Sequence, residues 1–180
     1  MMRRVPARMT SHAMDPTPKH RNHLTFDSVS SDDMRSLLTS ARAMRQTAAD
    51  GKHAALLRGK NLGLLCEVDA DADAALLRRA ALDLGAHVAQ IRPSLTELST
   101  PDEVRHTARL LGRLYDALAC QGLPLGLVQQ LSVDAGVPVF DGIASRSHPS
   151  AQLAALLADG VSPDDAQRYV LQAMLLHVLA

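Results

Sequence analysis

The stretch LGLLCEVDADADAALLRR, residues 62–79, joins a strand pattern to a helix pattern. Residues 62–66 form a short apolar run of the length of a buried strand, and residues 74–84 have the apolar spacing of a helix that stops at Gly85. A strand that runs directly into a helix is the basic unit of α/β proteins. This stretch therefore predicts a fold with helices packed on a sheet.

The rest of the chain repeats the same alternation. A helix is predicted from a capping Ser30 or Ser31 to the residue before Gly51. The further predicted elements are strands at 87–91, 115–120 and 137–140 and helices at 102–113, at 124–135, from about 149 and from about 163. Four short apolar strands separated by helices predict an α/β fold: a four-stranded parallel sheet with helices on both faces.

The composition excludes several classes of protein. Apolar residues make up 47% of the 180 residues but aromatic residues only 2%, so the core is aliphatic. Lys and Arg together number 19, as do Asp and Glu, and no run of about 18 apolar residues exists, so neither nucleic-acid nor membrane binding is expected. Cys66 and Cys120 are too few for a disulfide framework, and buried reduced thiols in a cytoplasmic protein are expected. The eight histidines form no His-x-x-x-His pair, and we expect no metal or cofactor.

The first 23 residues differ from the rest in composition. They hold five Lys or Arg against one Asp, three prolines and no apolar segment. We expect residues 1–23 to be a disordered basic extension, with an organelle transit peptide or a nucleic-acid-binding arm as alternatives. Residues 24–180 are expected to form a single domain.

Five blocks of the chain resemble one family in order. They are HLTFDSVSSDDMRSLLTSARAMR (23–45), LLRGKNLGLLCE (56–67), LDLGAHV (82–88), HTARLLGRLYDA (106–117) and VPVFDGIASRSHPS (137–150). Together they resemble the carbamoyl-phosphate domain of ornithine carbamoyltransferases, and the likeness extends to about residue 159. Residues 162–180, SPDDAQRYVLQAMLLHVLA, are similar to the C-terminal helix of that family, which returns to the first domain. The motifs of the ornithine-binding domain have no counterpart between them.

The resemblance implies that the carbamoyl-phosphate site has degenerated at the turn after the first strand. In the family this turn reads Ser-Thr-Arg-Thr-Arg and holds the phosphate at the helix N-terminus. The matching positions here are Ala70, Asp71, Ala72, Asp73 and Ala74. The arginines and hydroxyls are gone and two carboxylates have replaced them. At about 5 Å and an effective dielectric constant near 20, each like-charge pair costs roughly 3 kcal/mol.

Other positions that the resemblance assigns to the site have also changed. Gln121 stands where the family has the Arg that polarises the carbamoyl oxygen, and Glu97 where it has a Gln lent by a neighbouring subunit. The family's His-Pro-Cys-Gln becomes HPSA, which keeps His148 and Pro149 and replaces the Gln by Ala151. His148 is interpreted either as a hydrogen-bonding residue at the start of a helix or as the remnant of a ligand-binding cleft.

The aspartates of the turn also allow more than one interpretation. Asp69 or Asp71 can cap the helix, and its dipole favours the others by roughly 0.3–1 kcal/mol each. Alternatively, the carboxylates bind a cationic ligand, such as an amine or Mg²⁺. A calcium loop is not supported, because Ala74 and Ala80 stand where such a loop has its Gly and its Glu.

Two functional hypotheses follow. We favour a non-catalytic carbamoyltransferase-like protein, a truncated pseudoenzyme that acts as an assembly or regulatory module. The alternative is a repurposed small-molecule-binding protein or enzyme that uses the old cleft near His148, Asp71 and Asp73. The resemblance implies a homotrimer in which the turn after the first strand and the segment PSLTELS (93–99) meet a neighbour. A full-length carbamoyltransferase is a possible further partner.

Overall fold

Four parallel strands form the centre of the molecule in a computed structural model that describes residues 30–51, 55–68 and 71–180. The strands are β1 (Asn61–Cys66), β2 (His87–Ile91), β3 (Ala117–Gln121) and β4 (Val139–Asp141). Their order in the sheet is β2-β1-β3-β4, and every neighbouring pair is parallel. The predicted fold class is confirmed. The basic extension predicted for residues 1–23 lies outside the described residues.

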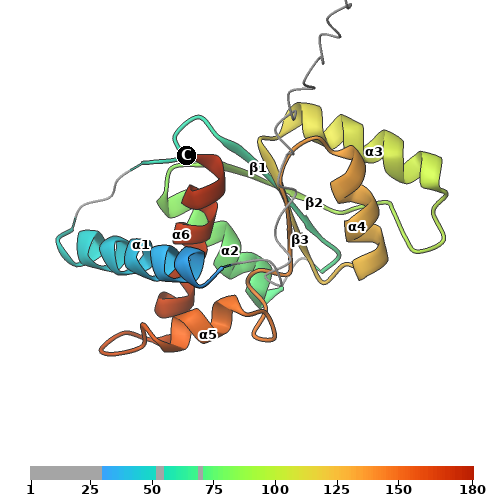
Figure 1. The fold of residues 1–180 in the computed structure, drawn as a ribbon. Coiled ribbons are helices and arrows are strands. Elements are labelled where there is room, and N and C mark those ends of the chain that lie inside the picture. The colour runs from blue at the N-terminus through green and yellow to red at the C-terminus, as the bar shows by residue number, and fades with distance from the viewer. Residues whose placement is uncertain (1–29, 52–54, 69–70) are drawn as a thin grey trace, which may run out of the picture.

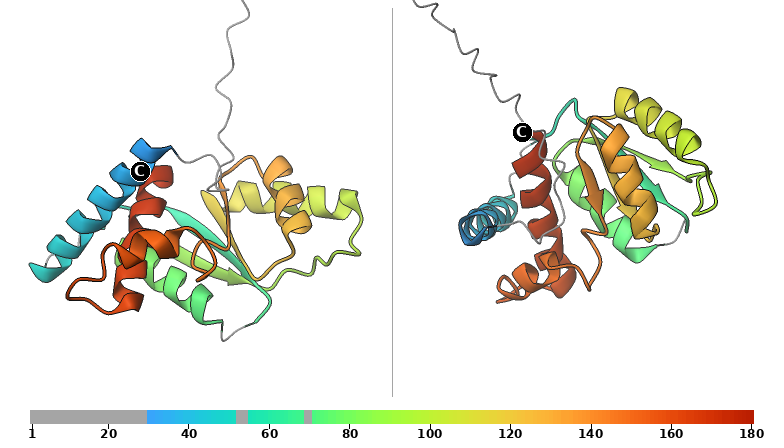
Figure 2. Two further views of the ribbon diagram at one scale, coloured as in Figure 1. Left: turned by 60° about the horizontal axis from the view of Figure 1, so that its bottom comes forward. Right: turned by 45° about the vertical axis from the view of Figure 1, so that its right-hand side comes forward.

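Helices cover both faces of this sheet (Figure 1). One face carries α3 (Pro101–Leu114) and α4 (Leu125–Asp134). The other face carries α1 (Ser31–Ala49), α2 (Ala72–Asp83), α5 (Ser150–Ala155) and α6 (Pro163–Leu179). The turned views in Figure 2 show the same division, with α3 and α4 on one side of the strands and α1, α5 and α6 on the other.

The alternation of side chains along the strands divides the core in two. Leu62, Leu64 and Cys66 of β1 pack with the buried residues of α2 and α6, whereas Leu65 packs with those of α3 and α4. Successive side chains of a strand point to opposite faces, so a fully buried strand needs apolar residues at every position. This is why the strand runs in the sequence are continuous rather than alternating.

Several predicted boundaries shift by one or two residues. The strand predicted at 115–120 begins at Ala117, because Tyr115 still belongs to the end of α3 and its N–H donates to Leu111 O at 3.0 Å. The last strand begins at Val139 rather than residue 137 and follows Pro138, which has no N–H to contribute to a ladder. Helix α2 begins at Ala72 rather than residue 74, because its cap lies earlier than the apolar pattern indicated.

The last helix is buried within the chain. Helix α6 begins after the N-cap Ser162 and packs against α1, α2 and α5. Its apolar side chains are buried there on more than one side of the helix, including Val170, Leu171 and Leu175. The breadth of its apolar surface is therefore explained without a second subunit.

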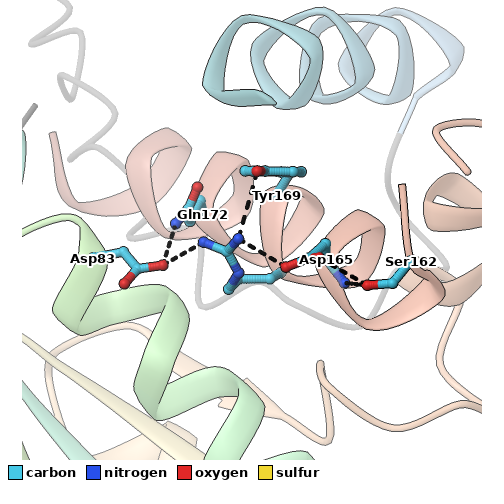
Figure 3. A network of polar contacts seen from close by, with 6 residues as sticks. Asp83, Ser162, Asp165, Tyr169 and Gln172 are labelled. Atoms are coloured by element: carbon cyan, nitrogen blue, oxygen red, sulfur yellow. Dashed lines mark hydrogen bonds and ion pairs between the residues drawn. The ribbon is translucent and has the colours of Figure 1, made fainter. Parts of the chain in front are cut away.

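A polar clasp, formed by Arg168, Asp83, Asp165, Gln172 and Ser162, fastens α6 to α2 (Figure 3). The guanidinium of Arg168 bonds to Asp83 near the end of α2, and to Asp165 in the first turn of α6 at 2.9 Å. Gln172 also donates to Asp83, at 3.3 Å. These bonds fix the position of α6 along α2, which apolar contacts alone do not determine.

No helix within the described residues is both long and apolar enough to cross a membrane.

Candidate functional site

The candidate site lies at the carboxyl ends of β1 and β3. The chain leaves β1 for β2 on one side of the sheet and leaves β3 for β4 on the other, so the strand order reverses between β1 and β3. In open α/β sheets the loops diverge at such a point, and ligands bind in the crevice between them. The turn from β1 into α2 and the end of β3 supply the residues nearest to this point.

Asp71 caps α2 and occupies the donor that an anion would use. Its Oδ1 accepts a hydrogen bond from Ala74 N at 2.7 Å, and its backbone is extended, as in an N-cap. A phosphate at a helix N-terminus is held by these same free N–H groups. The chain thus provides its own carboxylate at this position. The capping expected of Asp71 is confirmed, while Asp69 and Ala70 lie outside the described residues.

Asp73, two residues further, has a different environment. It is half-buried in the first turn of α2 and has no hydrogen bond or ion pair among the described residues. Burial and the neighbouring carboxylate of Asp71 raise the pKa of Asp73, and the more distant charge of Arg146 partly opposes this. Nothing in the spacing of residues along the chain indicated that Arg146, from the loop after β4, lies near enough to affect Asp73.

Gln121 ends β3 with an unusual side chain. It is only 2% exposed, and its Nε2 has no hydrogen-bond partner within the part of the chain that the structure describes. Strand alternation places it on the same face as Ala119 and, by register, beside Cys66. An unsatisfied buried amide costs roughly 1–3 kcal/mol. Gln121, which stands where the resemblance places an Arg, therefore buries an amide nitrogen without a hydrogen bond to offset the loss of water.

His148 is built into the start of α5. Its Nδ1 lies 3.2 Å from Ser150 N, which can donate to it in a neutral ring, and 3.0 Å from Ser150 Oγ. Burial lowers the pKa of His148, which favours this neutral form. Ser150 Oγ donates to Ile143 O at 2.6 Å and accepts from Gln167 Nε2 at 3.0 Å. These bonds join the loop after β4, α5 and α6, and they support a structural role for His148, which precedes Pro149.

A groove of about 780 Å³ lies between α2, the loop after β4, α5 and the start of α6. Three of the positions assigned from the sequence line it, namely Ala72, Asp73 and Ala151. Glu97 does not share this region, because it is exposed on the turn between β2 and α3. The spacing of residues along the chain could not indicate that the first turn of α2 faces α5 and α6 across a groove.

Metal and thiol chemistry find little support in the described residues. No group of three or more His, Cys, Asp or Glu side chains there is arranged to hold a metal ion. Cys66 and Cys120 are both buried and form no disulfide, and they point to opposite faces of the sheet. Burial and the charge of Asp141 raise the pKa of Cys120 to about 12, so this thiol is not a nucleophile at neutral pH.

Comparison with known proteins agrees with the geometry. The model of the carbamoyl-P binding domain of aspartate/ornithine carbamoyltransferases matches residues 21–158. The ornithine carbamoyltransferase of Actinobacillus pleuropneumoniae serotype 5b (strain L20) is 33% identical over 139 residues. That match covers 77% of this chain and 42% of the relative.

Solved structures show the same partial likeness. The ornithine carbamoyltransferase from Pyrococcus furiosus superimposes with a TM-score of 0.61 at 26% identity, over 70% of this chain and 40% of that one. The enzyme from Gloeobacter violaceus gives a TM-score of 0.54 at 28% identity, over 74% of this chain and 42% of that one. The chain thus spans less than half the length of the relatives it matches.

Proposed function

Because the chain belongs to the aspartate/ornithine carbamoyltransferase family through its carbamoyl-phosphate binding domain, we propose that it is a non-catalytic member of that family. In this proposal it keeps the scaffold as an assembly or regulatory module and does not transfer a carbamoyl group. One observation supports this most directly. The carboxylate of Asp71 accepts the N–H of Ala74 at 2.7 Å, at the helix terminus where the family binds phosphate.

Electrostatics make this replacement unfavourable to any phosphate. An incoming dianion meets the carboxylates of Asp71 and Asp73, and each like-charge pair at about 5 Å costs roughly 3 kcal/mol. The environment of Asp73 already disfavours negative charge, as its raised pKa indicates. The binding energy that a phosphate gains from a helix N-terminus cannot offset two such repulsions.

The carbamoyl end of the site is altered as well. Gln121 is neutral where the resemblance places an Arg, and Ala151 has no polar group where it places a Gln. Each lost charge-assisted hydrogen bond removes roughly 1.5–3 kcal/mol of affinity. Phosphate and carbamoyl recognition are therefore weakened independently.

Binding of carbamoyl phosphate tests the proposal. Calorimetry should detect no binding at millimolar ligand, and an assay with ornithine should form no citrulline, whereas a full-length ornithine carbamoyltransferase serves as the positive control. The triple variant Asp71→Thr, Ala72→Arg, Asp73→Thr restores the family's residues at three exposed or half-buried positions. It should gain measurable affinity for phosphate. Micromolar binding of carbamoyl phosphate to the unaltered chain would refute the proposal.

The assembly part of the proposal rests on two segments. The turn after β1 and residues 93–99, which the resemblance places at a subunit contact, expose Val68 (61%) and Leu98 (95%). Both side chains are open to contact with a partner. A second copy of the chain is the partner we favour, and a full-length carbamoyltransferase in a mixed trimer is the alternative.

A further inference from the structure

The groove between α2, α5 and α6 has walls of small side chains. Seven alanines line it, so methyl groups make up much of its surface. Its volume of about 780 Å³ lies within the range of small-molecule sites. An apolar lining of this kind suits the aliphatic part of a ligand, and polar groups decide which ligand it accepts.

The polar groups of the groove include three oxygen acceptors. Asp73 and Asp164 are carboxylates in the first turns of α2 and α6, and neither has a hydrogen bond or ion pair among the described residues. The third acceptor is the side-chain oxygen of Gln167, which is 8% exposed and lines the groove.

The orientation of the Gln167 amide follows from its partner. Ser150 Oγ has one proton and donates it to Ile143 O at 2.6 Å, so it must accept from Gln167 Nε2, at 3.0 Å. The amide oxygen therefore faces away from Ser150, and it accepts no hydrogen bond within the described residues. An acceptor that lines the groove without a donor can bond to a ligand that provides one.

We propose that this groove binds a small aliphatic amine, whose protonated amino group donates hydrogen bonds to Asp73 and the Gln167 oxygen while its chain packs on the alanines. An ammonium group has three N–H donors and no acceptor, so it can bond to oxygen acceptors such as these. The inference builds on the proposed function, because the carboxylate that repels phosphate is the one that attracts the amine.

Two arginines at the groove do not cancel this preference. Burial is the largest cause of the raised pKa of Asp73, and of the two neighbouring charges Asp71, which raises this pKa, acts more strongly than Arg146, which lowers it. The neighbouring charges at Asp73 therefore still favour added positive charge. Arg79 interacts with Asp165, which belongs to the clasp of α6. A divalent metal is less suited, since no metal-binding group of side chains exists in the described residues.

The probes are n-butylamine and 1,4-diaminobutane at constant ionic strength. Binding should raise the melting temperature by about 5–10 °C at about 100 times Kd. Sodium butyrate, which has the same chain length and the opposite charge, should give no shift. Tetramethylammonium, which has the charge without N–H donors, should give little.

Variants locate the site. Asp73→Asn should weaken amine binding about tenfold or more, because it removes a charged hydrogen-bond acceptor. Ala155→Leu, at an exposed position of α5, should block the groove without disturbing the core. Asp102→Asn is the matched control, since Asp102 is the second residue of α3 as Asp73 is of α2.

Three results would overturn the inference: no response to either amine, an equal response to butyrate, or unchanged amine affinity in Asp73→Asn. None of these results would show that the protein binds carbamoyl phosphate, so the proposed function is tested separately, by its own binding experiment. Conversely, carbamoyl-phosphate binding with no amine binding would reject both.

Discussion

Two carboxylates of the same turn differ in what they contribute to the protein. Asp71 Oδ1 bonds to Ala74 N, whereas Asp73 has no partner among the described residues and its pKa is raised by burial and by Asp71. Both were expected to favour the helix, one as a cap and the other through the dipole. The structure confirms the cap and shows that the second carboxylate is held in a less favourable environment. Helix stability alone therefore does not account for the carboxylate of Asp73.

Replacement of Asp71 should therefore destabilise the protein, and its effect depends on the cap rather than on the charge. Asp71→Ala removes the bond to Ala74 N and should lower the free energy of unfolding by about 0.5–2 kcal/mol. Asp71→Ser retains a capping oxygen and should recover most of that loss. Urea denaturation at pH 7 measures both. Equal losses for Ala and Ser would show that the charge, and not the hydrogen bond, stabilises α2.

Replacement of Asp73 should have the opposite pH dependence from an ordinary stabilising carboxylate. Its folded-state pKa is raised above 3.8, so the folded state binds the proton more tightly, and stability is lost as pH rises through the folded pKa. Asp73→Asn removes this effect. It should leave the protein equally stable or slightly more stable at pH 7, and the difference from the parent should shrink below about pH 4. A clear loss of stability at pH 7 would mean that the helix dipole outweighs burial.

At the scale of elements, α3 and α4 approach each other at a glycine. A Cβ at Gly112 would lie 1.7 Å from the backbone oxygen of Ala135, which cannot move without displacing the end of α4. Gly112→Ala should thus destabilise the protein by about 1–3 kcal/mol, although alanine favours an isolated helix by about 1 kcal/mol.

Gly126 in α4 supplies the control, since a Cβ there would meet nothing within 4 Å. Gly126→Ala should be neutral or stabilising by up to about 1 kcal/mol. Thermal and urea unfolding compare the two variants. If Gly112→Ala is tolerated as well as Gly126→Ala, the two helices do not pack as closely as the structure shows.

The clasp between α6 and α2 should make the protein sensitive to acid. Hydrogen bonds from Arg168 and Ser162 lower the pKa of Asp165 below 3.8, so its contribution is present above the unfolded pKa and is lost as pH falls through the folded pKa. Asp165→Asn should cost up to about 1 kcal/mol at pH 7, as for a partly exposed pair, and this difference should disappear towards pH 3. Asp164→Asn, beside it and outside the clasp, is the control.

The sequence predicted every strand and helix of this architecture but placed several ends only approximately. Continuous apolar runs and helical spacing identify elements, whereas their ends depend on single bonds such as that from Tyr115 N to Leu111 O. The site was less predictable. Asp71 could be identified as a cap from its position before a helix, but the groove, the orphaned amide of Gln121 and the nearness of Arg146 to Asp73 arise from tertiary packing.

At the scale of the whole molecule, the exposed apolar side chains that bear on assembly lie outside α6. Helix α6 is apolar on more than one side, and its packing on α1, α2 and α5 accounts for this. The case for assembly therefore depends on another region. Val68 and Leu98 are exposed in the segments that follow two neighbouring parallel strands, β1 and β2, and we refer to these two segments as the β1/β2 edge.

We predict that the protein is a homotrimer whose contacts include this edge. The resemblance places the turn after the first strand and residues 93–99 at the contact between subunits, and both segments expose apolar side chains here. Stable homo-oligomers bury about 2,000 Å² or more of largely apolar surface. Light scattering at micromolar concentration should give three times the 19.3 kDa mass of the chain.

Leu98→Glu tests whether this edge forms the trimer contact. A charge buried in an apolar interface without a partner is strongly unfavourable, so the variant should dissociate to monomers while keeping its circular dichroism spectrum. Leu110→Glu, at an exposed leucine of α3, should remain trimeric. A stable monomer of the unaltered chain would contradict the assembly role. A trimer that survives Leu98→Glu but not Leu110→Glu would move the interface to the α3 and α4 face, and the likeness to the family would then not extend to the way its subunits meet.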